Sequence, residues 1–294
     1  MTVDQFADAR PTLFSIAYRM LGSVMDAEDL VQDAYTRWQE TNPAEIRSPQ
    51  AFLTTIITRL CINHLQAART RREVYVGPWL PEPLVTDPAP SALDHIELAE
   101  SLSMAFMVLL ERLSPTERAV FLLREVFAFD YVDIARIVEK SEANCRQLFA
   151  RSRKHLEARQ ARFPVSPEKA ERLVEQFSAA ARGGNVDALV GILAEDITLW
   201  SDGGGKVAAA LHPIHGSSHV ARFVVGALAK FVPAGAVACM AKVNGQPGIL
   251  SYVGGQPQAA LVFDIAGDRI SAVYVITNPD KLRSVPPRPV PADS

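Results

Sequence analysis

A stretch near the middle of the chain carries cationic and amide side chains at the spacing of one helix. Arginine can donate two hydrogen bonds to a guanine edge in the DNA major groove, and asparagine and glutamine can pair similarly with adenine. Side chains at the amino end of such a helix reach base edges, while cations further along contact phosphates. The candidate base-contacting residues are Ser141, Glu142, Asn144, Arg146 and Gln147, and the candidate phosphate contacts are Arg151, Arg153 and Lys154.

The elements that would position these side chains form a predicted helix-turn-helix. Ser114 and Pro115, followed by Glu117, indicate a helix start, because a hydroxyl cap, an early proline and an early acid all favour one. A short second helix and a tight turn at 139–141 then lead into the basic helix. A helix that is apolar behind and cationic in front suits docking in the major groove. The alternative is an ordinary three-helix packing unit with a solvated basic face.

Residues 10–72 are predicted to form an all-helical block that carries two further polar surfaces. One helix places four carboxylates opposite its apolar side, which is either a solvated acidic face or a docking surface for a basic partner. The helix at 51–72 places polar residues inside an otherwise apolar pattern, as a surface that holds unstacked bases and phosphates requires. The first set is Asp26, Glu28, Asp29 and Asp33, and the second is Thr58, Arg59, Asn63, Arg69, Arg71 and Arg72.

Composition limits the kind of protein this chain can be. Its 294 residues suffice for two or three small domains, and the net charge of −3 means that any contact with DNA must be local. Asp4 and Asp8 stand where a secretory signal would be cationic, and no apolar run approaches the roughly 18 residues of a membrane span. The three cysteines have no metal-ligand spacing, so we predict no metal, no cofactor and a reducing cytoplasm as the location.

Two changes of composition predict the domain boundaries. Residues 76–90 are too rich in proline for a helix interior or a central strand, and they indicate an extended linker. After residue 163, helical segments give way to strand-like runs separated by glycine turns, which indicates an α+β domain. Those runs lie at 197–202, 236–243, 248–253, 259–265 and 269–277. We expect helical domains at 1–75 and 109–163, a linker with a connecting helix at 76–108, an α+β domain at 164–285 and a disordered tail at 286–294.

Several segments carry a resemblance to a known family. DAEDLVQDAYTRW at 26–38, SPQAFLTTIITRLCINHL at 48–65 and RLSPTERAVFLLREVFAFDYVDIARIV at 112–138 resemble domains 2 and 4 of sigma-70-family factors, with no domain 3 between them. That is the layout of extracytoplasmic-function (ECF) sigma factors. WLPEP at 79–83, DGGGK at 202–206 and NPDK at 278–281 are similar to motifs of the group with a fused C-terminal SnoaL-like domain. The implied fold is multidomain: two all-α sigma domains, a helical bundle and a helix-turn-helix, plus a C-terminal α+β SnoaL-like cone with a curved sheet.

The resemblance implies an alternative RNA polymerase sigma factor that directs promoter recognition and transcription initiation. It implies that the acidic helix docks on the clamp helices of core polymerase and that the basic helix reads the minus-35 element. The 51–72 helix would face the minus-ten element through Arg59, Asn63, Arg69, Arg71 and Arg72. We expect the C-terminal domain to regulate the chain in cis by packing on the linker or on domain 2, through Trp79, Leu80, Pro81, Asp202, Lys206, Asn278, Asp280 and Lys281.

Other functions of the C-terminal domain stay open at this point. Some SnoaL-like relatives are enzymes, but a fold does not confer an activity, and we expect no catalysis. DGGGK could instead cradle a phosphate, although its spacing matches no P-loop. The alternative for the whole chain is a one-component helix-turn-helix regulator with a small-molecule-sensing domain, which would have no use for the acidic helix or the 51–72 helix. The candidate residues for a small-molecule or catalytic site are Trp200, Asp202, His215 and His219.

Overall fold

The chain folds into two compact units in a computed structural model. The structure describes residues 3–42, 46, 48–72, 75–86, 102–157 and 165–288. The side chains of residues 3, 4, 68–72 and 157 are not described. Unit 1 comprises Met1–Val74, Pro90–Leu102 and Phe106–Gln160, and unit 2 comprises Tyr75–Ala89, Ser103–Ala105 and Ala161–Ser294. Residues 75–86, expected to be a linker between domains, are therefore part of the C-terminal unit. Much of the expected connecting helix lies outside the described residues.

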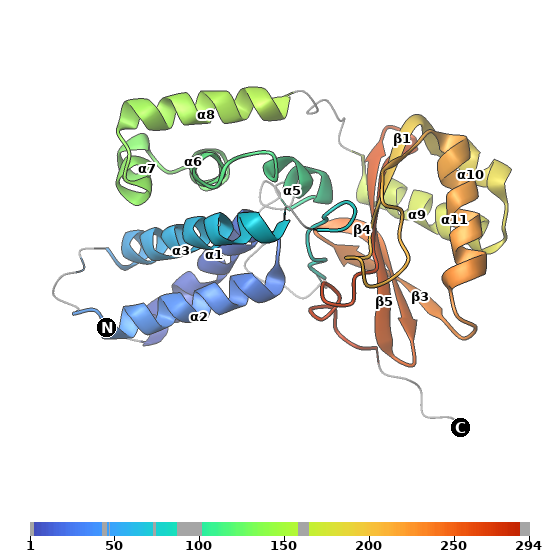
Figure 1. The fold of residues 1–294 in the computed structure, drawn as a ribbon, viewed down its shortest axis with the longest axis horizontal. Coiled ribbons are helices and arrows are strands. Elements are labelled where there is room, and N and C mark those ends of the chain that lie inside the picture. The colour runs from blue at the N-terminus through green and yellow to red at the C-terminus, as the bar shows by residue number, and fades with distance from the viewer. Residues whose placement is uncertain are drawn as a thin grey trace. The chain divides into compact units, whose positions relative to one another are not determined.

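Three helices open unit 1: α1 (Val3–Leu21), α2 (Val24–Glu40) and α3 (Pro49–Arg72) (Figure 1). α1 ends where Gly22 takes a φ of 68°, a left-handed conformation that glycine adopts without steric cost. α2 begins because the hydroxyl of Ser23 accepts a hydrogen bond from the amide of Asp26 at 3.1 Å and so caps the first turn. The core of this block includes Leu13, Tyr18, Trp38, Leu53 and Ile57.

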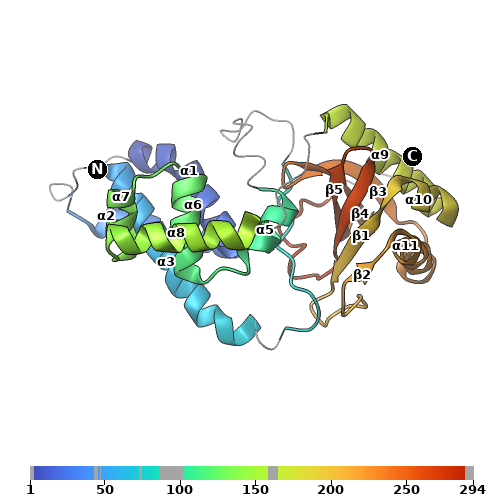
Figure 2. The ribbon, with the colours of Figure 1, turned by 90° about the horizontal axis from the view of Figure 1, so that it is seen from above.

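The predicted helix-turn-helix is confirmed in the later part of unit 1. It consists of α6 (Pro115–Glu125), α7 (Tyr131–Val138) and α8 (Glu142–Glu157), preceded by the short α5 (Met104–Leu110). At the start of α6, the Glu117 carboxylate accepts the Ser114 amide at 3.0 Å while the Ser114 hydroxyl accepts the Glu117 amide. α7 ends at Glu139, whose φ of 54° turns the chain toward α8. Figure 2 shows α8 crossing α6.

The described part of unit 2 contains a six-stranded sheet and three helices, which confirms the predicted α+β class. The strands are ordered β2-β1-β6-β5-β4-β3, and every neighbouring pair is antiparallel except β1 with β6. The elements are α9 (Pro167–Arg182), α10 (Val186–Ile192), β1 (Leu193–Asp202), β2 (Ile214–His215), α11 (Ser217–Phe231), β3 (Val237–Val243), β4 (Gln246–Val253), β5 (Gln256–Ala266) and β6 (Arg269–Ile276).

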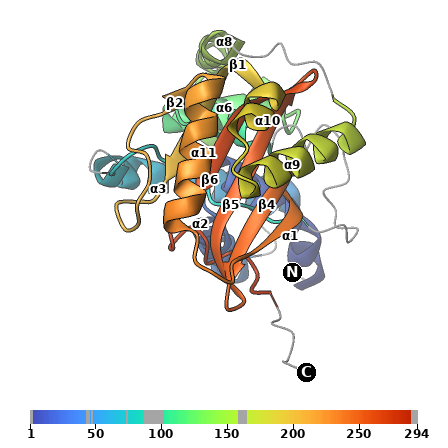
Figure 3. The same cartoon turned by 90° about the vertical axis from the view of Figure 1, so that its right-hand side faces the viewer.

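The two faces of this sheet are covered differently. The helices α9, α10 and α11 lie on one face (Figure 3), where Phe177 meets Phe263 edge to face at 4.9 Å within a continuous apolar core. Because successive strand residues point to opposite faces, Trp200 and Asp202 belong to the other face. There Trp200 stacks on Tyr274 with the ring centroids 5.0 Å apart. Asp202 bonds to the segment 75–86 on this same face.

All five strand-like runs are strands, but α11 and β2 are not predicted from the sequence. α11 contains the β-branched residues Val220, Val224 and Val225 and an internal Gly226, all of which lower helix propensity. Burial of Val220 and Val224 against the sheet overrides that local preference. None of the helices in the described ranges is long and apolar enough to cross a membrane. Of the expected disordered tail, Arg288 donates its amide to the carbonyl of Gly255, and residues 289–294 lie outside the description.

Candidate functional site

The acidic residues of α2 form an exposed surface of unit 1. Asp29 and Asp33 lie one turn apart and share a face with Met25, whose exposed fraction is 47%. Glu28 pairs with Arg10 at 2.5 Å, and a carboxylate oxygen of Asp26 lies 3.5 Å from an imidazole nitrogen of His64 on α3. The outer face of α2 therefore combines carboxylates with an exposed thioether, which suits docking on a basic and partly apolar partner.

Arg59, a predicted minus-ten contact on α3, is held by the end of α7. Its Nε donates to the carbonyl of Ile137 and its Nη2 to the carbonyl of Arg136, each at 2.9 Å. Its Nη1 pairs with the carboxylate of Glu139, also at 2.9 Å. A guanidinium is favourable here because the last carbonyls of a helix have no partner within it and carry the negative end of the helix dipole. Arg59 therefore joins α3 to the turn that precedes α8.

The junction between these two groups of helices also has a buried part. Arg118 on α6 is 3% exposed, and its Nη1 donates to the carbonyl of Met20 near the end of α1 at 2.6 Å. The same nitrogen pairs with Glu111 at 2.7 Å. Unit 1 thus joins its opening helices to the helix-turn-helix through one buried arginine and through Arg59, which is 42% exposed.

The remaining minus-ten candidates differ in their surroundings. Asn63 is exposed on α3, where it can reach a ligand. Thr58 is fully buried, and its hydroxyl has no hydrogen-bond partner among the described residues. Arg69, Arg71 and Arg72 belong to α3, but their side chains lie outside the described part of the chain.

The amino end of α8 presents the predicted base-contacting residues to solvent. The hydroxyl of Ser141 accepts the amide of Asn144 at 3.2 Å and so caps the helix. The Arg146 guanidinium lies 3.5 Å from the Glu142 carboxylate and 4.3 Å from the ring centroid of Tyr131. An amide and a guanidinium placed in this way can both meet base edges in a major groove. The exposed residues are Ser141, Glu142, Asn144, Arg146 and Gln147.

Among the predicted phosphate contacts, Arg153 and Lys154 are exposed, while Arg151 is bonded to α6. Its Nε donates to Glu117 at 2.6 Å, and Glu117 is 9% exposed. Burial alone would raise the pKa of Glu117, but hydrogen bonds from Ser114 and from Arg151 outweigh burial and lower the pKa. Arg151 therefore holds α8 against α6, whatever it contacts on DNA.

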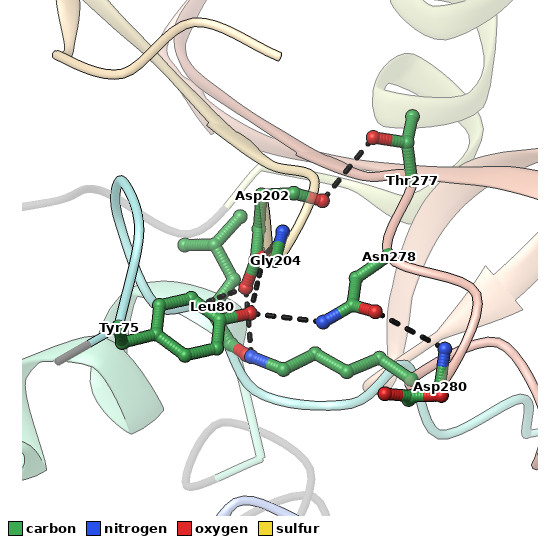
Figure 4. Close-up of polar contacts among 8 residues, drawn as sticks. Tyr75, Leu80, Asp202, Gly204, Thr277, Asn278 and Asp280 are labelled. Atoms are coloured by element: carbon green, nitrogen blue, oxygen red, sulfur yellow. Dashed lines mark hydrogen bonds and ion pairs between the residues drawn. The ribbon is translucent and has the colours of Figure 1, made fainter. Parts of the chain in front are cut away.

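Several of the predicted regulatory residues of unit 2 meet around a buried carboxylate (Figure 4), whereas Lys206 and Asp280 pair at the surface. Asp202 is fully buried and accepts the hydroxyl of Tyr75 at 2.6 Å and the amide of Leu80 at 2.8 Å. It also pairs with the ammonium of Lys281 at 2.7 Å and accepts the amide of Gly204 at 3.0 Å. We call this group, Asp202 and Lys281 with Tyr75, Asn278 and the main chain of Leu80, the linker clamp.

Lys281 completes the clamp from the NPDK segment. Its ammonium donates to the carbonyl of Leu80 and lies 4.1 Å from the ring centroid of Trp79. The amide of Asn278 donates to the hydroxyl of Tyr75 at 2.9 Å. Burial raises the pKa of Tyr75, and its hydrogen bond to Asp202 raises it further, so the hydroxyl stays protonated as a donor. Both polar groups of the Leu80 backbone are therefore bound by one ion pair.

The glycines of DGGGK allow this close approach. Gly204 has a φ of 60°, and a Cβ placed on it would stand 2.2 Å from the side-chain nitrogen of Asn278. The lysine of the motif, Lys206, pairs with Asp280 at the surface, and Arg283 lies 2.9 Å from the same carboxylate. The hydrogen bond from Lys206 lowers the pKa of Asp280. The lysine that a phosphate-binding loop would offer is thus already bonded within the domain.

A second attachment holds the same segment at the edge of the sheet. Leu84 donates its amide to the side chain of Asn244 at 3.1 Å and accepts the amide of Asn244 at 2.7 Å. Thr86 donates its amide to the carbonyl of Lys242 at 2.9 Å, and Val85 forms a β-bridge with Val243. Sequence reasoning missed both Asn244 and Tyr75. The Asn-Gly pair at 244–245 signals only a hairpin turn, which it also forms.

The candidate small-molecule residues have partners within the domain. Trp200 on β1 stacks on Tyr274, and His215 on the neighbouring strand β2 lies 3.1 Å from the hydroxyl of Thr198. His219 is exposed, with its Nδ1 3.2 Å from the carbonyl of His215. Asp202 is occupied by the linker clamp. No group of three or more metal-binding side chains occurs in the part of the chain that the structure describes.

Comparisons with known proteins agree with this arrangement. The model of Sigma-70 region 2 matches residues 6–71, and that of Sigma-70 region 4 matches residues 103–156. The ECF RNA polymerase sigma factor SigJ of Mycobacterium tuberculosis H37Rv is 37% identical over 97% of this chain and 95% of its own. The probable ECF sigma factor SigI of strain CDC 1551 is 28% identical over 93% and 92%. The crystal structure of M. tuberculosis SigJ has a TM-score of 0.79 at 34% identity and covers 98% of this chain and 100% of that one.

Proposed function

Because the chain belongs to the ECF RNA polymerase sigma factors of the sigma-70 family, we propose that its fused C-terminal domain regulates promoter engagement in cis by holding the segment 75–86. An alternative sigma factor directs transcription initiation, and its partners are core RNA polymerase and promoter DNA. Sigma factors are not enzymes. The chain would act in the cytoplasm, where the polymerase is.

The observation that carries this proposal is the capture of the Leu80 backbone by a buried ion pair. Asp202 accepts the amide of Leu80 and Lys281 donates to its carbonyl, so the polar contacts of the hold are made to the main chain, while the Leu80 side chain is buried. The segment 75–86 follows the region 2 match and precedes the region 4 match. Fixing it to unit 2 restricts how far apart the two sigma regions can place themselves on a promoter.

Within the sigma regions, we assign one surface to each partner. The outer face of α2, with Asp29 and Asp33, docks on the clamp helices of the polymerase. The surface of α3 with Asn63 receives the minus-ten element, and the amino end of α8 reads the minus-35 element. Three of the five N–H donors of Arg59 bond to the end of α7, so Arg59 must leave α7 to offer DNA its full set of donors.

Run-off transcription with purified core polymerase tests the regulatory role. Templates are promoter fragments selected by the wild-type holoenzyme, and the variants are Asp202→Asn and Lys281→Met, with Lys206→Met as the exposed control. Asp202→Asn and Lys281→Met should release the segment 75–86 from the clamp and so change the transcript yield several-fold. The Lys206→Met control should give the same yield as the wild type. Equal yields from all four proteins, at equal core affinity, would leave the domain without a regulatory role. Point variants test the clamp more specifically than a deletion after Arg162 does. That deletion would remove most of unit 2 and leave residues 75–89, which belong to it, without their contacts.

Core binding is tested separately. Reversing Asp29 and Asp33 to lysine should weaken the affinity for core polymerase measured by titration, because the surface charge changes sign while the fold is little affected. Asp187→Lys is the matched control, since Asp187 is an exposed acid on α10 in the other unit. If the chain bound no core polymerase at all but still bound DNA, the one-component regulator would replace the sigma factor as the better description.

A further inference from the structure

One aromatic ring on α7 contacts both of the other helices of the helix-turn-helix. Tyr131 is the first residue of α7, and the guanidinium of Arg124 on α6 lies 5.0 Å from its ring centroid. The guanidinium of Arg146 on α8 lies 4.3 Å from the same centroid. Phe149, also on α8, packs against the ring at 6.2 Å with the planes 76° apart. Both arginines are within the range of a cation–π interaction, in which the negative face of the ring attracts the cation.

The position of the ring is fixed from the α6 side. Arg124 donates to the carbonyl of Phe129 at 2.8 Å and pairs with Asp130 at 3.3 Å. Phe129 and Asp130 immediately precede Tyr131, so these bonds set the direction in which the chain enters α7. Arg124 is therefore a structural residue of the α6–α7 turn. By fixing that turn, it positions the Tyr131 ring beside α8.

Arg146 is different, because no backbone group in the described chain accounts for its position. Its side chain is 60% exposed. Among the described residues, its ionic and ring contacts are with the Tyr131 ring and, at 3.5 Å, the carboxylate of Glu142 one turn earlier. A surface arginine loses roughly 1.5–2 kcal/mol of side-chain entropy when it is fixed in one conformation. A ring and a carboxylate that already restrict the side chain reduce that loss on binding.

We propose that Tyr131 is a positioning residue for promoter recognition, whose ring holds the Arg146 guanidinium in the orientation that pairs with a guanine edge in the major groove. The proposal rests on the function assigned to α8 above. A planar guanidinium donates two parallel hydrogen bonds to the O6 and N7 of guanine, so its orientation decides specificity as well as affinity. Tyr131 itself acts through Arg146 and makes no base contact. Lysine at position 146 would keep the charge but lose both the planar fork and the stacking.

Duplex binding by the full-length holoenzyme tests this inference. The probes are duplexes that the wild-type holoenzyme selects from a randomised pool, and each is compared with versions in which single guanines are replaced. Arg146→Ala should weaken binding by roughly 5- to 150-fold and abolish the preference at one guanine. Tyr131→Leu should weaken binding by about 2- to 5-fold, with the preference reduced at the same guanine. Tyr131→Phe keeps the ring and should match the wild type.

The decisive measurement is the combination of Tyr131→Leu with Arg146→Ala. If the ring acts through Arg146, the double variant binds as Arg146→Ala alone does, and additive losses would overturn the proposal. A loss in Tyr131→Phe would overturn it too, since the hydroxyl would then be the contacting group. If Arg146→Ala binds normally, the base-reading role assigned to this residue fails first, and this inference with it.

A second variant keeps the inference testable if Tyr131→Leu disturbs the fold. Arg146→Lys leaves the ring in place, and we expect it to weaken the guanine preference while retaining the salt dependence of binding, because the charge is unchanged. Wild-type preference in Arg146→Lys would overturn the proposal. A fall in the salt slope by about 0.9 in Arg146→Ala, without any loss of base preference, would make Arg146 a phosphate contact and would overturn it equally.

Discussion

In each unit a cationic side chain joins two segments of that unit, but the two side chains differ in exposure to solvent. In unit 1, Arg59 and Glu139 are 42% and 73% exposed, and the arginine's other partners are carbonyls at a helix end. In unit 2, Asp202 and Lys281 are 0% and 8% exposed, and an aromatic residue, Trp79, covers the lysine. The Arg59 contact, unlike the buried Arg118 contact beside it, is open to water and salt, whereas the linker clamp is closed to both.

This difference assigns a different task to each junction. Exposed ion pairs contribute roughly 0.2–1 kcal/mol, so DNA phosphates can compete for Arg59. Removing one partner of a buried pair leaves an uncompensated charge and costs about 3–5 kcal/mol, so the linker clamp is a lasting constraint. We therefore expect a lasting hold on the segment 75–86 and a reversible Arg59 contact inside the sigma regions.

The largest effect is expected from Lys281→Met, which breaks the linker clamp. Asp202 would be left as a buried, unpaired carboxylate, and we expect the local stability of the clamp to fall by about 3–5 kcal/mol. Amide hydrogen exchange at Leu80 measures this directly, because the Leu80 amide is the group that Asp202 accepts. Unchanged protection at Leu80 would mean that the ion pair does not secure the segment.

An intermediate effect is expected at Glu117, where a carboxylate that is 9% exposed meets an arginine that is 59% exposed. Glu117→Gln preserves the capping box but removes the charge, and should cost about 1 kcal/mol at neutral pH. The folded-state pKa of Glu117 is lowered, so its contribution is complete above the unfolded value of about 4.3 and is lost as the pH falls through the folded value. Urea unfolding at several pH values should show the two proteins converging in acid. A constant difference would contradict this linkage.

Glu139→Gly should have a smaller effect on stability but should change how often α3 and α7 separate. It removes the exposed ion pair with Arg59, worth about 0.2–1 kcal/mol, while glycine suits the left-handed φ of 54° at this position. The fold should therefore survive, and α3 should separate from α7 more often. Spin labels at Asn63 and Lys154 would report longer distances. Asp133→Ala, which removes another acid on α7 that pairs only locally with Arg136, is the control and should leave the distances unchanged.

The smallest effect is expected from Lys206→Met. Its ion pair with Asp280 lies at the surface, and Asp280 keeps Arg283 as a second partner. We expect the unfolding free energy to change by less than about 0.5 kcal/mol. A loss comparable to that of Lys281→Met would show that burial is not what separates the two lysines.

Much of this arrangement could be predicted from local signals in the sequence. Helix caps, apolar periodicity and strand alternation identified the helix-turn-helix and five of the strands, because those features depend on neighbouring residues. Asp202, Asn278 and Lys281 were grouped by their motifs, and the structure brings them together. What local signals could not provide is pairing at long range. Tyr75 and Asn244 lie 127 and 160 residues from their partners Asp202 and Leu84, and nothing in either sequence segment marks the other. The engagement of Arg59 by α7 was missed for the same reason.

The separation of the clamp residues along the chain also has a consequence during protein synthesis. Leu80 leaves the ribosome 122 residues before Asp202 and 201 residues before Lys281. At about 5–20 residues per second, a nascent chain spends roughly 10–40 s with its segment 75–86 already made and Lys281 still to come. Both sigma regions become complete within that interval, once residue 156 has been made. Each new molecule therefore passes once through an unclamped state while still attached to its messenger RNA, before the last strand and the NPDK segment close over Leu80.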